Sequence, residues 1–295
     1  MEKIIEAKGL LSKVKKSNRW FGYDFNMNLY RGCLHGCIYC DSRSECYEVG
    51  EFEEVKIKGN ALEILENELR SKRSTGIIGM GSMSDPYNPY EIKYELTKKS
   101  LILMERFKFG VFIITKSDLV LRDIDLLKRV DKCGRAIVGL TITCGSDELS
   151  KVIEPKVSSS SERFKALKAL SDNGIDAGIL LMPILPFIND TEENVRDIVK
   201  YAIESKAKFI YPFFGVTLRD KQREFYYDNL EKSFPGLKNK YIARYGKNYS
   251  CESDKAKELY ALLGRLCDEA NILHRMEDIN KLFEMNKEFE QLSLF

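Results

Sequence analysis

The sequence predicts an α/β protein, a partial (β/α)6 TIM-like barrel with a C-terminal helical extension. From residue 20 to about 216, short runs of apolar and β-branched residues alternate with amphipathic segments. This alternation is typical of βα units that build a parallel sheet. After residue 217 the pattern changes to successive helices, one of them rich in aromatic residues.

Six runs predict the strands of the sheet. Their apolar residues follow one another without alternation, as in strands that are buried on both faces. These runs are residues 23–30, 75–81, 109–116, 136–143, 176–185 and 207–216.

Five amphipathic segments between the strands predict helices, because apolar residues recur in them at i, i+3 and i+4. These segments are residues 61–73, 96–107, 123–130, 161–174 and 192–206. The serines at 158–161 can cap the start of the fourth helix, and Gly174 can end it. Thr191 marks the start of the fifth helix.

Six such units predict a barrel with two units fewer than a (β/α)8 barrel. Ligands of such a barrel bind at the carboxyl ends of the strands. The chain then divides into an N-terminal extension (1–19), the barrel (20–216), a helical extension (217–290) and a short tail (291–295).

Composition narrows the chemistry. The chain has 295 residues, with 47 basic and 45 acidic ones, so the net charge of +2 argues neither for nor against a nucleic-acid partner. With only two histidines, His35 and His274, histidine-rich zinc sites and Ser-His-Asp catalysis are almost excluded.

The first 16 residues contain no apolar core of signal-peptide length, and no segment reaches the roughly 20 apolar residues of a membrane helix. We therefore expect a cytoplasmic protein. Its eight cysteines should stay thiols or metal ligands there, because disulfides are rare in a reducing compartment.

Three cysteines form the most informative motif. Cys33, Cys37 and Cys40 have the spacing C-x3-C-x2-C after the first predicted strand. Thiolates bind iron and zinc, and three ligands leave one iron of a [4Fe-4S] cluster open to another chelator. The alternative is a zinc knuckle, which needs a fourth ligand from His35 or Cys46.

The motif and its place in a six-unit barrel resemble the radical S-adenosylmethionine (SAM) superfamily over about residues 20–216. The resemblance implies that the amine and carboxylate of SAM chelate the open iron. It also implies reductive cleavage of SAM to a 5′-deoxyadenosyl radical and an external electron donor of the flavodoxin or ferredoxin type.

Other candidate site residues follow the later strands. Ser82, Ser84 and Asp85 could bind an amino acid moiety, or they could cap a turn. Lys116 ends the third strand, where a cation suits a carboxylate, although a solvated lysine is the alternative.

Two further strand ends offer candidates. Thr141 and Thr143 end the fourth strand, and Met182 and Pro183 end the fifth. They could flank adenosine, or they could be ordinary packing residues of the strands.

The segments SDPYNPYE, TKSDLVLRDIDLL, IEPKVSSSSERFKALKALSDNGI and MPILPFIND resemble the spore photoproduct lyase-like, or DNA repair photolyase-like, family. This resemblance implies that Ser84, Lys116 and Thr141 contact SAM. Glu154 and Arg163 belong to the family pattern, either as an ion pair that holds a loop or as catalytic groups.

One position departs from that family. Ser82 stands where the lyases have the cysteine that returns a hydrogen atom to the product radical. An alcohol O–H bond is too strong for that step, so Cys144 or Cys46 would have to substitute for Ser82 as the catalytic donor. Cys133, Cys251 and Cys267 are expected to be buried apolar side chains.

The last residues suggest a partner. Gln291, Leu292, Leu294 and Phe295 resemble the peptide by which bacterial repair proteins bind the DNA sliding clamp, or they form a segment folded back on the protein. Residues 13–23 and 238–249 mix cations with aromatic rings, which suits contact with DNA or a solvated face.

The predicted function is a radical SAM enzyme that acts on DNA, in lesion repair or base modification. The same chemistry on RNA, a peptide or a small metabolite is the second hypothesis. A non-catalytic, clamp-associated metal-binding protein is the third.

Overall fold

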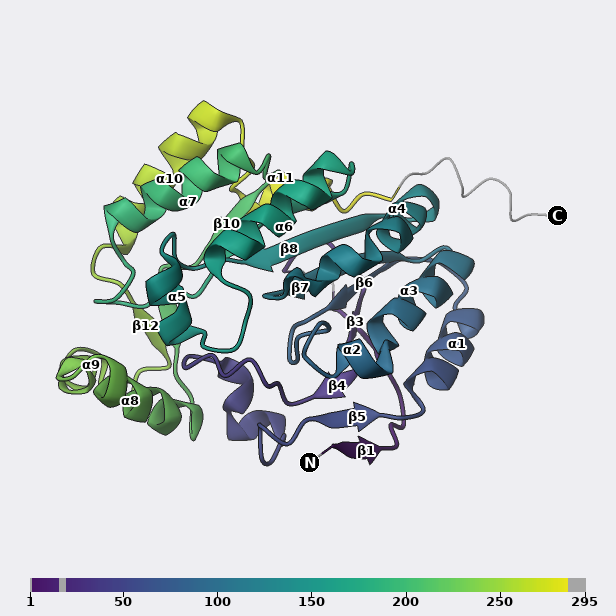
Figure 1. Cartoon of the computed structure of the whole chain (residues 1–295), viewed down its shortest axis with the longest axis horizontal. Coiled ribbons are helices and arrows are strands. Elements are labelled where there is room, and N and C mark those ends of the chain that lie inside the picture. Colours follow the sequence, from purple (N-terminus) through teal and green to yellow (C-terminus); the bar gives the residue numbers. More distant parts are fainter. Residues whose placement is uncertain (1, 16–19, 286–295) are drawn as a thin grey trace.

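The centre of the computed structural model, which describes residues 2–15 and 20–285, is a seven-stranded sheet (Figure 1). Six strands are parallel, and β2 adds to one edge antiparallel to β3. The order across the sheet is β10 (Ile210–Pro212), β9 (Asp176–Leu181), β8 (Ala136–Thr141), β7 (Gly110–Thr115), β6 (Ile77–Met80), β3 (Phe25–Met27) and β2 (Leu11–Lys13). The six parallel strands coincide with the six predicted runs, which confirms the fold class.

Residues of these strands point alternately to the two faces of the sheet. In β8, Ala136 and Val138 pack in the large core beneath the helices, and Ile137 belongs to a smaller cluster on the other face. That smaller cluster includes Phe21 and Phe283, so segments from both ends of the chain cover the inner face of the sheet.

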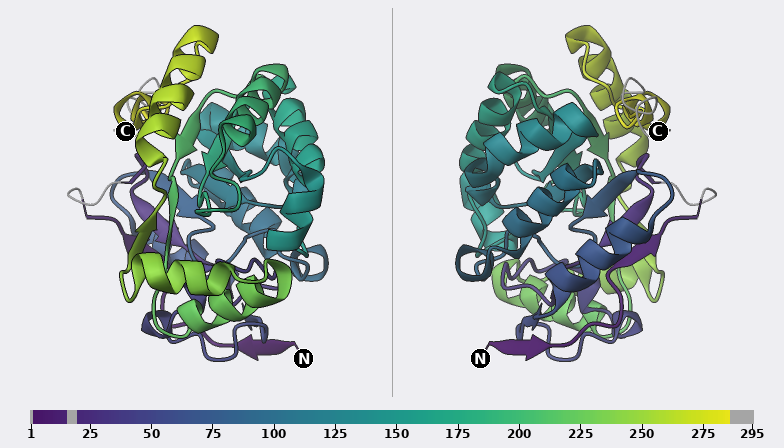
Figure 2. Two further views of the ribbon diagram at one scale, coloured as in Figure 1. Left: turned by 90° about the vertical axis from the view of Figure 1, so that its left-hand side faces the viewer. Right: turned by 90° about the vertical axis from the view of Figure 1, so that its right-hand side faces the viewer.

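The five predicted helices are present and lie along the outer face of the sheet (Figure 2). They are α1 (Ala61–Ser71), α3 (Leu96–Arg106), α4 (Ile124–Cys133), α6 (Ser160–Asp172) and α7 (Glu192–Glu204). The predicted caps are confirmed: Ser159 and Glu162 form a capping box, and the Thr191 hydroxyl accepts a hydrogen bond from the backbone of Asn194.

The structure adds short strands that the sequence did not indicate as separate elements. A second sheet has the order β1 (Lys3–Ile5), β5 (Lys56–Lys58) and β4 (Tyr30–Arg31), and β11 (Gly215–Thr217) pairs with β12 (Ser250–Glu252). Runs of two or three residues are too short to show a period along the sequence. Strand β4 leads directly into the cysteine motif.

The C-terminal part is mainly helical. It contains α8 (Gln222–Ser233), α9 (Leu237–Tyr245), α10 (Ala256–Ala270) and α11 (Met276–Lys281). The barrel segment itself has two further short helices, α2 (Glu91–Tyr94) and α5 (Asp147–Ile153). The Gln222 side chain donates to the carbonyl oxygen of Tyr39 at 3.1 Å, so α8 is tied to the cysteine loop. None of the described helices has the length and apolar character needed to span a bilayer.

Two predicted contact regions fall wholly or partly outside the described residues. The tail residues Gln291, Leu292, Leu294 and Phe295 lie beyond residue 285, and the basic segment 13–23 includes residues 16–19. The clamp-binding hypothesis therefore stays a prediction.

Candidate active site

A cavity of about 270 Å³ lies at the carboxyl ends of strands β6 to β9, where barrels of this kind bind ligands. Side chains from the cysteine loop and from four strand ends line it. Among them is every predicted site residue except Cys144: Cys33, Cys37, Cys40, Ser82, Ser84, Asp85, Lys116, Thr141 and Met182. Residues far apart in the sequence thus converge on one cavity.

The three cysteines lie on the loop that follows β4. Gly32 starts this loop with a φ of +86°, and a Cβ atom there would lie 2.5 Å from the carbonyl oxygen of Phe52. Only glycine suits both conditions. Cys33 and Cys37 are buried, Cys40 is partly exposed, and all three thiols are free.

The pKa values of the three thiols differ. Burial raises the pKa of Cys37 and of Cys40. Burial acts in the same direction on Cys33, but the charge and hydrogen bonds of His35 outweigh it and lower the pKa of that thiol. Cys33 is therefore the thiol that ionises most readily, and thiolates are the metal-binding form.

His35 has a place that the sequence did not indicate. Its Nδ1 atom lies 3.3 Å from Oδ2 of Asp85. Burial alone would lower the pKa of His35, but Asp85 and the Cys33 thiolate raise it to about 10. The imidazolium therefore links the cysteine loop to the loop after β6. A histidine inside a cysteine motif was the one signal that could have indicated this role.

Asp85 is held by several protein donors. Its carboxylate accepts hydrogen bonds from the Thr115 hydroxyl at 2.7 Å and from the backbone N–H of Lys116 at 2.8 Å. Burial would raise the pKa of Asp85, but His35 and these donors lower it to about 2. These contacts indicate that Asp85, on the loop after β6, holds the end of β7 in position.

The two serines approach the cavity on the loop after β6. Ser84 is buried and donates to the carbonyl oxygen of Gly32 at 2.6 Å, so this loop is tied to the cysteine loop. Ser82 is exposed at the cavity. Gly81 allows the turn between them and β6, because its φ is +100° and a Cβ atom there would lie 2.1 Å from the carbonyl oxygen of Ile114.

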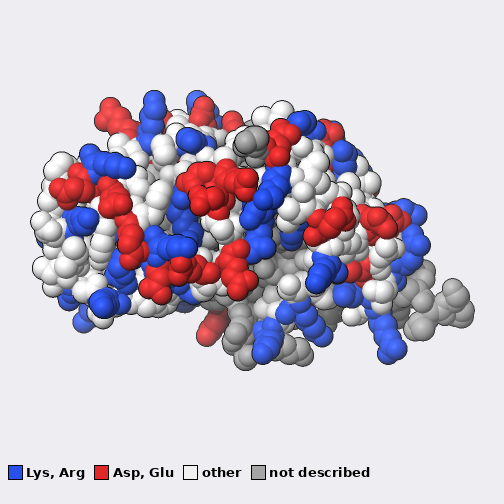
Figure 3. All heavy atoms as spheres, turned by 90° about the horizontal axis from the view of Figure 1, so that it is seen from below, with Lys and Arg blue, Asp and Glu red and all other residues white. Residues whose placement is uncertain are grey.

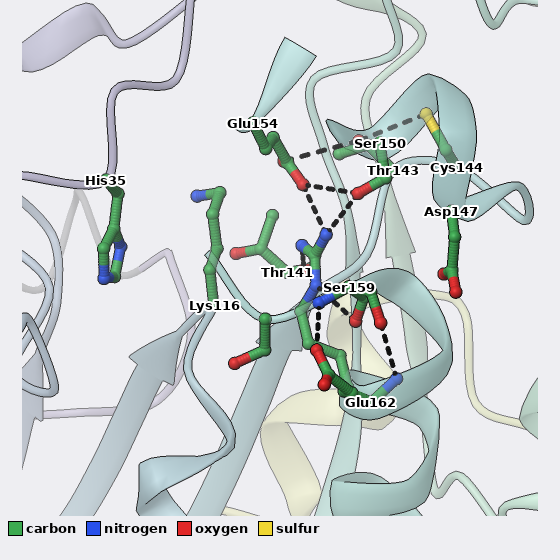
Figure 4. Close-up of polar contacts among 12 residues, drawn as sticks. His35, Lys116, Thr141, Thr143, Cys144, Asp147, Ser150, Glu154, Ser159 and Glu162 are labelled. Carbon is green, nitrogen blue, oxygen red and sulfur yellow. Dashed lines mark hydrogen bonds and ion pairs between the residues drawn. The ribbon is translucent and has the colours of Figure 1, made fainter. Parts of the chain in front are cut away.

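Lys116 extends from the end of β7 between His35 and Glu154 (Figure 4). Its ammonium makes no hydrogen bond or ion pair with the residues that the structure describes, and it stands 5.8 Å from the ring centroid of Tyr39. Burial would lower the pKa of Lys116, but nearby acidic groups, first among them Cys37, raise it. A protonated, unpaired ammonium at a cavity suits a ligand carboxylate.

A fully buried ion pair lies behind the cavity. Nη2 of Arg163 lies 2.6 Å from Oε2 of Glu154, and both side chains have 0% exposure. The Tyr39 hydroxyl, from the cysteine loop, donates to the same carboxylate, and Arg163 Nη1 donates to the carbonyl oxygen of Thr141 at 2.5 Å (Figure 4). Because neither charged residue lines the cavity, the geometry favours an ion pair that holds a loop.

The candidate residues of the fourth and fifth strands separate into two groups. Thr141, Met182 and Pro183 line the cavity. Thr143 is buried, and its hydroxyl lies 3.5 Å from Glu154 instead. Thr143 therefore belongs to the buried polar contacts behind the cavity and not to its lining.

Cys144 lies away from the cavity. It is fully buried, and the Asn189 amide donates to its Sγ atom at 3.5 Å. Burial raises the pKa of this thiol to about 12. The geometry does not support Cys144 as a hydrogen donor to a ligand in the cavity.

None of the other thiols outside the cysteine loop is placed to act as the hydrogen donor in place of Cys144. Cys46 is exposed, lies 3.3 Å from a guanidinium nitrogen of Arg219, and does not line the cavity. Cys251 and Cys267 are buried as expected. The expectation for Cys133 was wrong, because this residue is partly exposed at the C-terminal end of α4.

The donor set fits an iron–sulfur cluster that binds a zwitterionic ligand. Three free thiols could supply cluster ligands, and the Lys116 ammonium and the small polar residues face the same space. Within residues 2–15 and 20–285, no three His, Cys, Asp or Glu side chains come close enough to hold a single metal ion.

The chain is similar to a family model and to proteins of two microorganisms. The model of the Radical SAM superfamily matches residues 27–202. An uncharacterized protein of Methanocaldococcus jannaschii is 34% identical over 217 residues, which cover 72% of this chain and 78% of the relative. An uncharacterized protein of Mycobacterium tuberculosis is 26% identical over 249 residues, 81% of this chain and 72% of the relative.

Solved structures share the fold. Spore photoproduct lyase complexed with a dinucleoside spore photoproduct superposes with a TM-score of 0.66 and 16% identity, over 91% of this chain and 79% of the lyase. The radical SAM methyltransferase TsrM of Kitasatospora setae, with cobalamin and a [4Fe-4S] cluster bound, superposes with a TM-score of 0.58 and 13% identity. The match covers 85% of this chain and 54% of TsrM. The chain is therefore an enzyme of the radical SAM superfamily, whose members use a [4Fe-4S] cluster and S-adenosylmethionine.

Proposed function

We propose that this enzyme cleaves SAM reductively and acts on DNA, in lesion repair or base modification. The observation that carries the first part is the convergence of three free thiols and an unpaired Lys116 ammonium on one cavity. In this proposal residues 20–216 carry the chemistry, and residues 217–290 form a helical extension beside it.

Cys33, Cys37 and Cys40 would hold the cluster, and Lys116 would bind the carboxylate of SAM. Ser84, Thr141 and Met182 would line the rest of the SAM site, with Asp85 positioning the end of β7. When bound, the reduced cluster and SAM supply a 5′-deoxyadenosyl radical. The residues of this chain orient SAM and exclude water from the cavity.

The DNA substrate rests on two kinds of support. The solved spore photoproduct lyase that shares this fold has a dinucleoside spore photoproduct bound. Four segments of this chain also resemble the family of that lyase. The reaction would differ in its last step, because Ser82 replaces the donor cysteine and Cys144 lies behind the cavity. A thiol outside the chain would then return the hydrogen atom, or an external reductant would supply an electron and the solvent a proton.

A second candidate is the same radical chemistry on another substrate. One TsrM structure contains a tryptophan substrate and a SAM analogue, so this fold also accommodates small molecules. RNA, a peptide or a small metabolite belongs to this hypothesis.

The proposed partners are DNA, a flavodoxin or ferredoxin type electron donor, and the DNA sliding clamp through Gln291, Leu292, Leu294 and Phe295. The cytoplasm would keep the cluster thiols reduced.

The test uses protein that is purified without oxygen and reconstituted with iron and sulfide. Dithionite and SAM are added, and 5′-deoxyadenosine is measured beside a Cys37→Ala control. 5′-Deoxyadenosine formed by the intact enzyme but not by Cys37→Ala supports SAM cleavage. The proposal is contradicted if neither protein forms 5′-deoxyadenosine.

The proposed action on DNA is tested in the same reaction. Unlabelled SAM is combined with a pool of oligonucleotides that carry ultraviolet lesions. Mass spectrometry then follows the consumption of each lesion. Enhancement of 5′-deoxyadenosine formation by DNA, with loss of one lesion, supports the proposal. Uncoupled SAM cleavage with all lesions unchanged favours the second candidate.

A further inference from the structure

A second cavity, of about 410 Å³, adjoins the first one, and Met83 lines both. Its walls are the N-terminal segment 5–9, strands β4 and β5, and the stretch after the cysteine loop. None of the predicted site residues lies in it. Three basic side chains line it: Lys8, Arg31 and Lys58.

The small sheet places two of these cations together. Directly opposite residues of paired strands share a face, and in this sheet Lys56 pairs with Lys3 and with Arg31. Lys58 lies two residues along β5, on the same face as Lys56. The other face carries Ile57, with 1% exposure, against the core. The buried face thus carries Ile57 and Tyr30, although Ile4 at its edge is 61% exposed, and the opposite face carries the cations.

Carboxylates do not neutralise these cations. Lys58 Nζ donates to the carbonyl oxygen of Asn28 at 2.6 Å, and Arg31 donates to the carbonyl oxygen of Tyr47 at 3.2 Å. Lys56 Nζ donates to the carbonyl oxygen of Val49 at 2.8 Å. In the described part of the chain, no carboxylate lies within 4 Å of the charged groups of Arg31, Lys56 or Lys58.

Two carboxylates are near enough to consider. Glu6 lines the cavity, but it forms no ion pair with the described residues. Glu68 attracts Lys58, but this effect on the pKa of Lys58 is smaller than those of burial and of Arg31. The two Glu68 oxygens accept hydrogen bonds from the backbone of Leu10 and Leu11 at 3.1 and 2.8 Å. Burial, and then repulsion from Arg31, lower the pKa of Lys58. A bound anion would relieve this repulsion.

Charges of both signs surround this cavity. The face that includes β1, seen from below, carries acidic and basic side chains in alternation (Figure 3). Ion pairs link many of them, such as Lys3 with Glu54 at 3.6 Å. The cations of the second cavity have no such partner among the described residues, and they lie beside the cavity where SAM is proposed to bind.

We infer that the second cavity binds a phosphate group of the substrate strand, next to the nucleotide that reacts in the first cavity. Arg31 and Lys58 would contact the phosphate oxygens directly, and Met83 would separate the phosphate from the reacting base. This inference rests on the proposed function, because it assumes a substrate that carries phosphodiesters. Phosphate contacts fix the register of a nucleic acid without reading its sequence.

The test compares the reconstituted enzyme with its Lys58→Gln variant in binding a fluorescent single-stranded DNA oligonucleotide. We expect about ten-fold weaker binding, as for the loss of one charge-assisted hydrogen bond. The slope of log Kd against log salt should also fall by about 0.7, the value for one phosphate contact on a single strand. The matched control is Lys128→Gln, which removes the same charge from an exposed position on α4. It should change neither quantity.

A second measurement identifies the phosphate. A neutral methylphosphonate replaces one phosphodiester at a time along the oligonucleotide. The intact enzyme should lose affinity at one position near the bound base, and Lys58→Gln should be insensitive at that position. Equal Kd, equal salt slope and an equal methylphosphonate profile for both proteins would overturn the inference.

Two further probes separate this inference from the proposed function. If the intact enzyme cleaves SAM but binds no DNA, an RNA oligonucleotide and inorganic phosphate are tested in turn, with chloride at equal ionic strength as the reference. Binding that depends on Lys58 keeps the phosphate site and rejects DNA as the substrate. No difference between the proteins with any phosphate probe rejects the site itself.

Discussion

Replacing Arg163 with methionine tests the buried ion pair behind the active site. The substitution leaves the Glu154 carboxylate buried at 0% exposure without its cation, and it removes the donors to Ser150 and to the Thr141 carbonyl oxygen. Leaving one member of a buried pair uncompensated costs about 3–5 kcal/mol. For a chain of 295 residues the melting temperature should fall by roughly 5–8 °C.

The assay is urea denaturation of the cluster-free protein at neutral pH under reducing conditions. The matched control is Arg196→Met, which breaks an exposed pair with Glu192 at 3.2 Å and should cost less than about 1 kcal/mol. The double variant Arg163→Met/Glu154→Gln should recover at least half of the loss, because the neutral amide still accepts the hydrogen bond from Tyr39.

The pH dependence has a definite sign. Burial would raise the pKa of Glu154, but Arg163 and Lys116 lower it. Its contribution is therefore present above the unfolded pKa, about 4.3, and is lost as the pH falls through the lower folded value. In Arg163→Met the carboxyl protonates more readily, so the difference in stability should shrink with acid. A cost below about 1 kcal/mol at pH 7, or a double variant as unstable as the single one, would refute this reasoning.

Three further predictions concern the cavity. Burial would lower the pKa of His35, but its acidic neighbours raise it to about 10. Protonated His35 therefore contributes its full stabilisation of the fold below about pH 6.5, the unfolded pKa. This stabilisation is lost as the pH rises through the folded pKa. Urea titrations of the cluster-free protein from pH 7 to 10 should show this loss, and His35→Gln should not. Lys116→Met should weaken SAM binding about ten-fold or more in equilibrium dialysis while the iron content is unchanged; equal affinity would contradict the carboxylate contact. Cys144→Ala should retain both the cluster absorbance and 5′-deoxyadenosine formation, and loss of the latter with iron retained would return Cys144 to the reaction.

Much of the barrel could be predicted because its information is local. The six parallel strands are continuous apolar runs, and each helix between them has its own apolar face and its own cap. The spacing of Cys33, Cys37 and Cys40 is likewise local, since three thiols on one short loop can reach one cluster wherever the loop lies. The order of the strands then brings Ser84 and Lys116 to the same edge of the sheet.

Contacts between distant segments were decided only by the tertiary structure. Strands β1, β4 and β5 have two or three residues each, so their pairing depends on packing that no sequence period records. The ion pair between His35 and Asp85 forms because two loops meet at the cavity. Cys144 lies one residue from a buried threonine near the strand end, yet the turn after β8 directs it away from the cavity. The sequence by itself determined the chemistry and the fold class, whereas long-range packing decided which side chains face the cavity, because a side chain's direction depends on the whole surrounding structure.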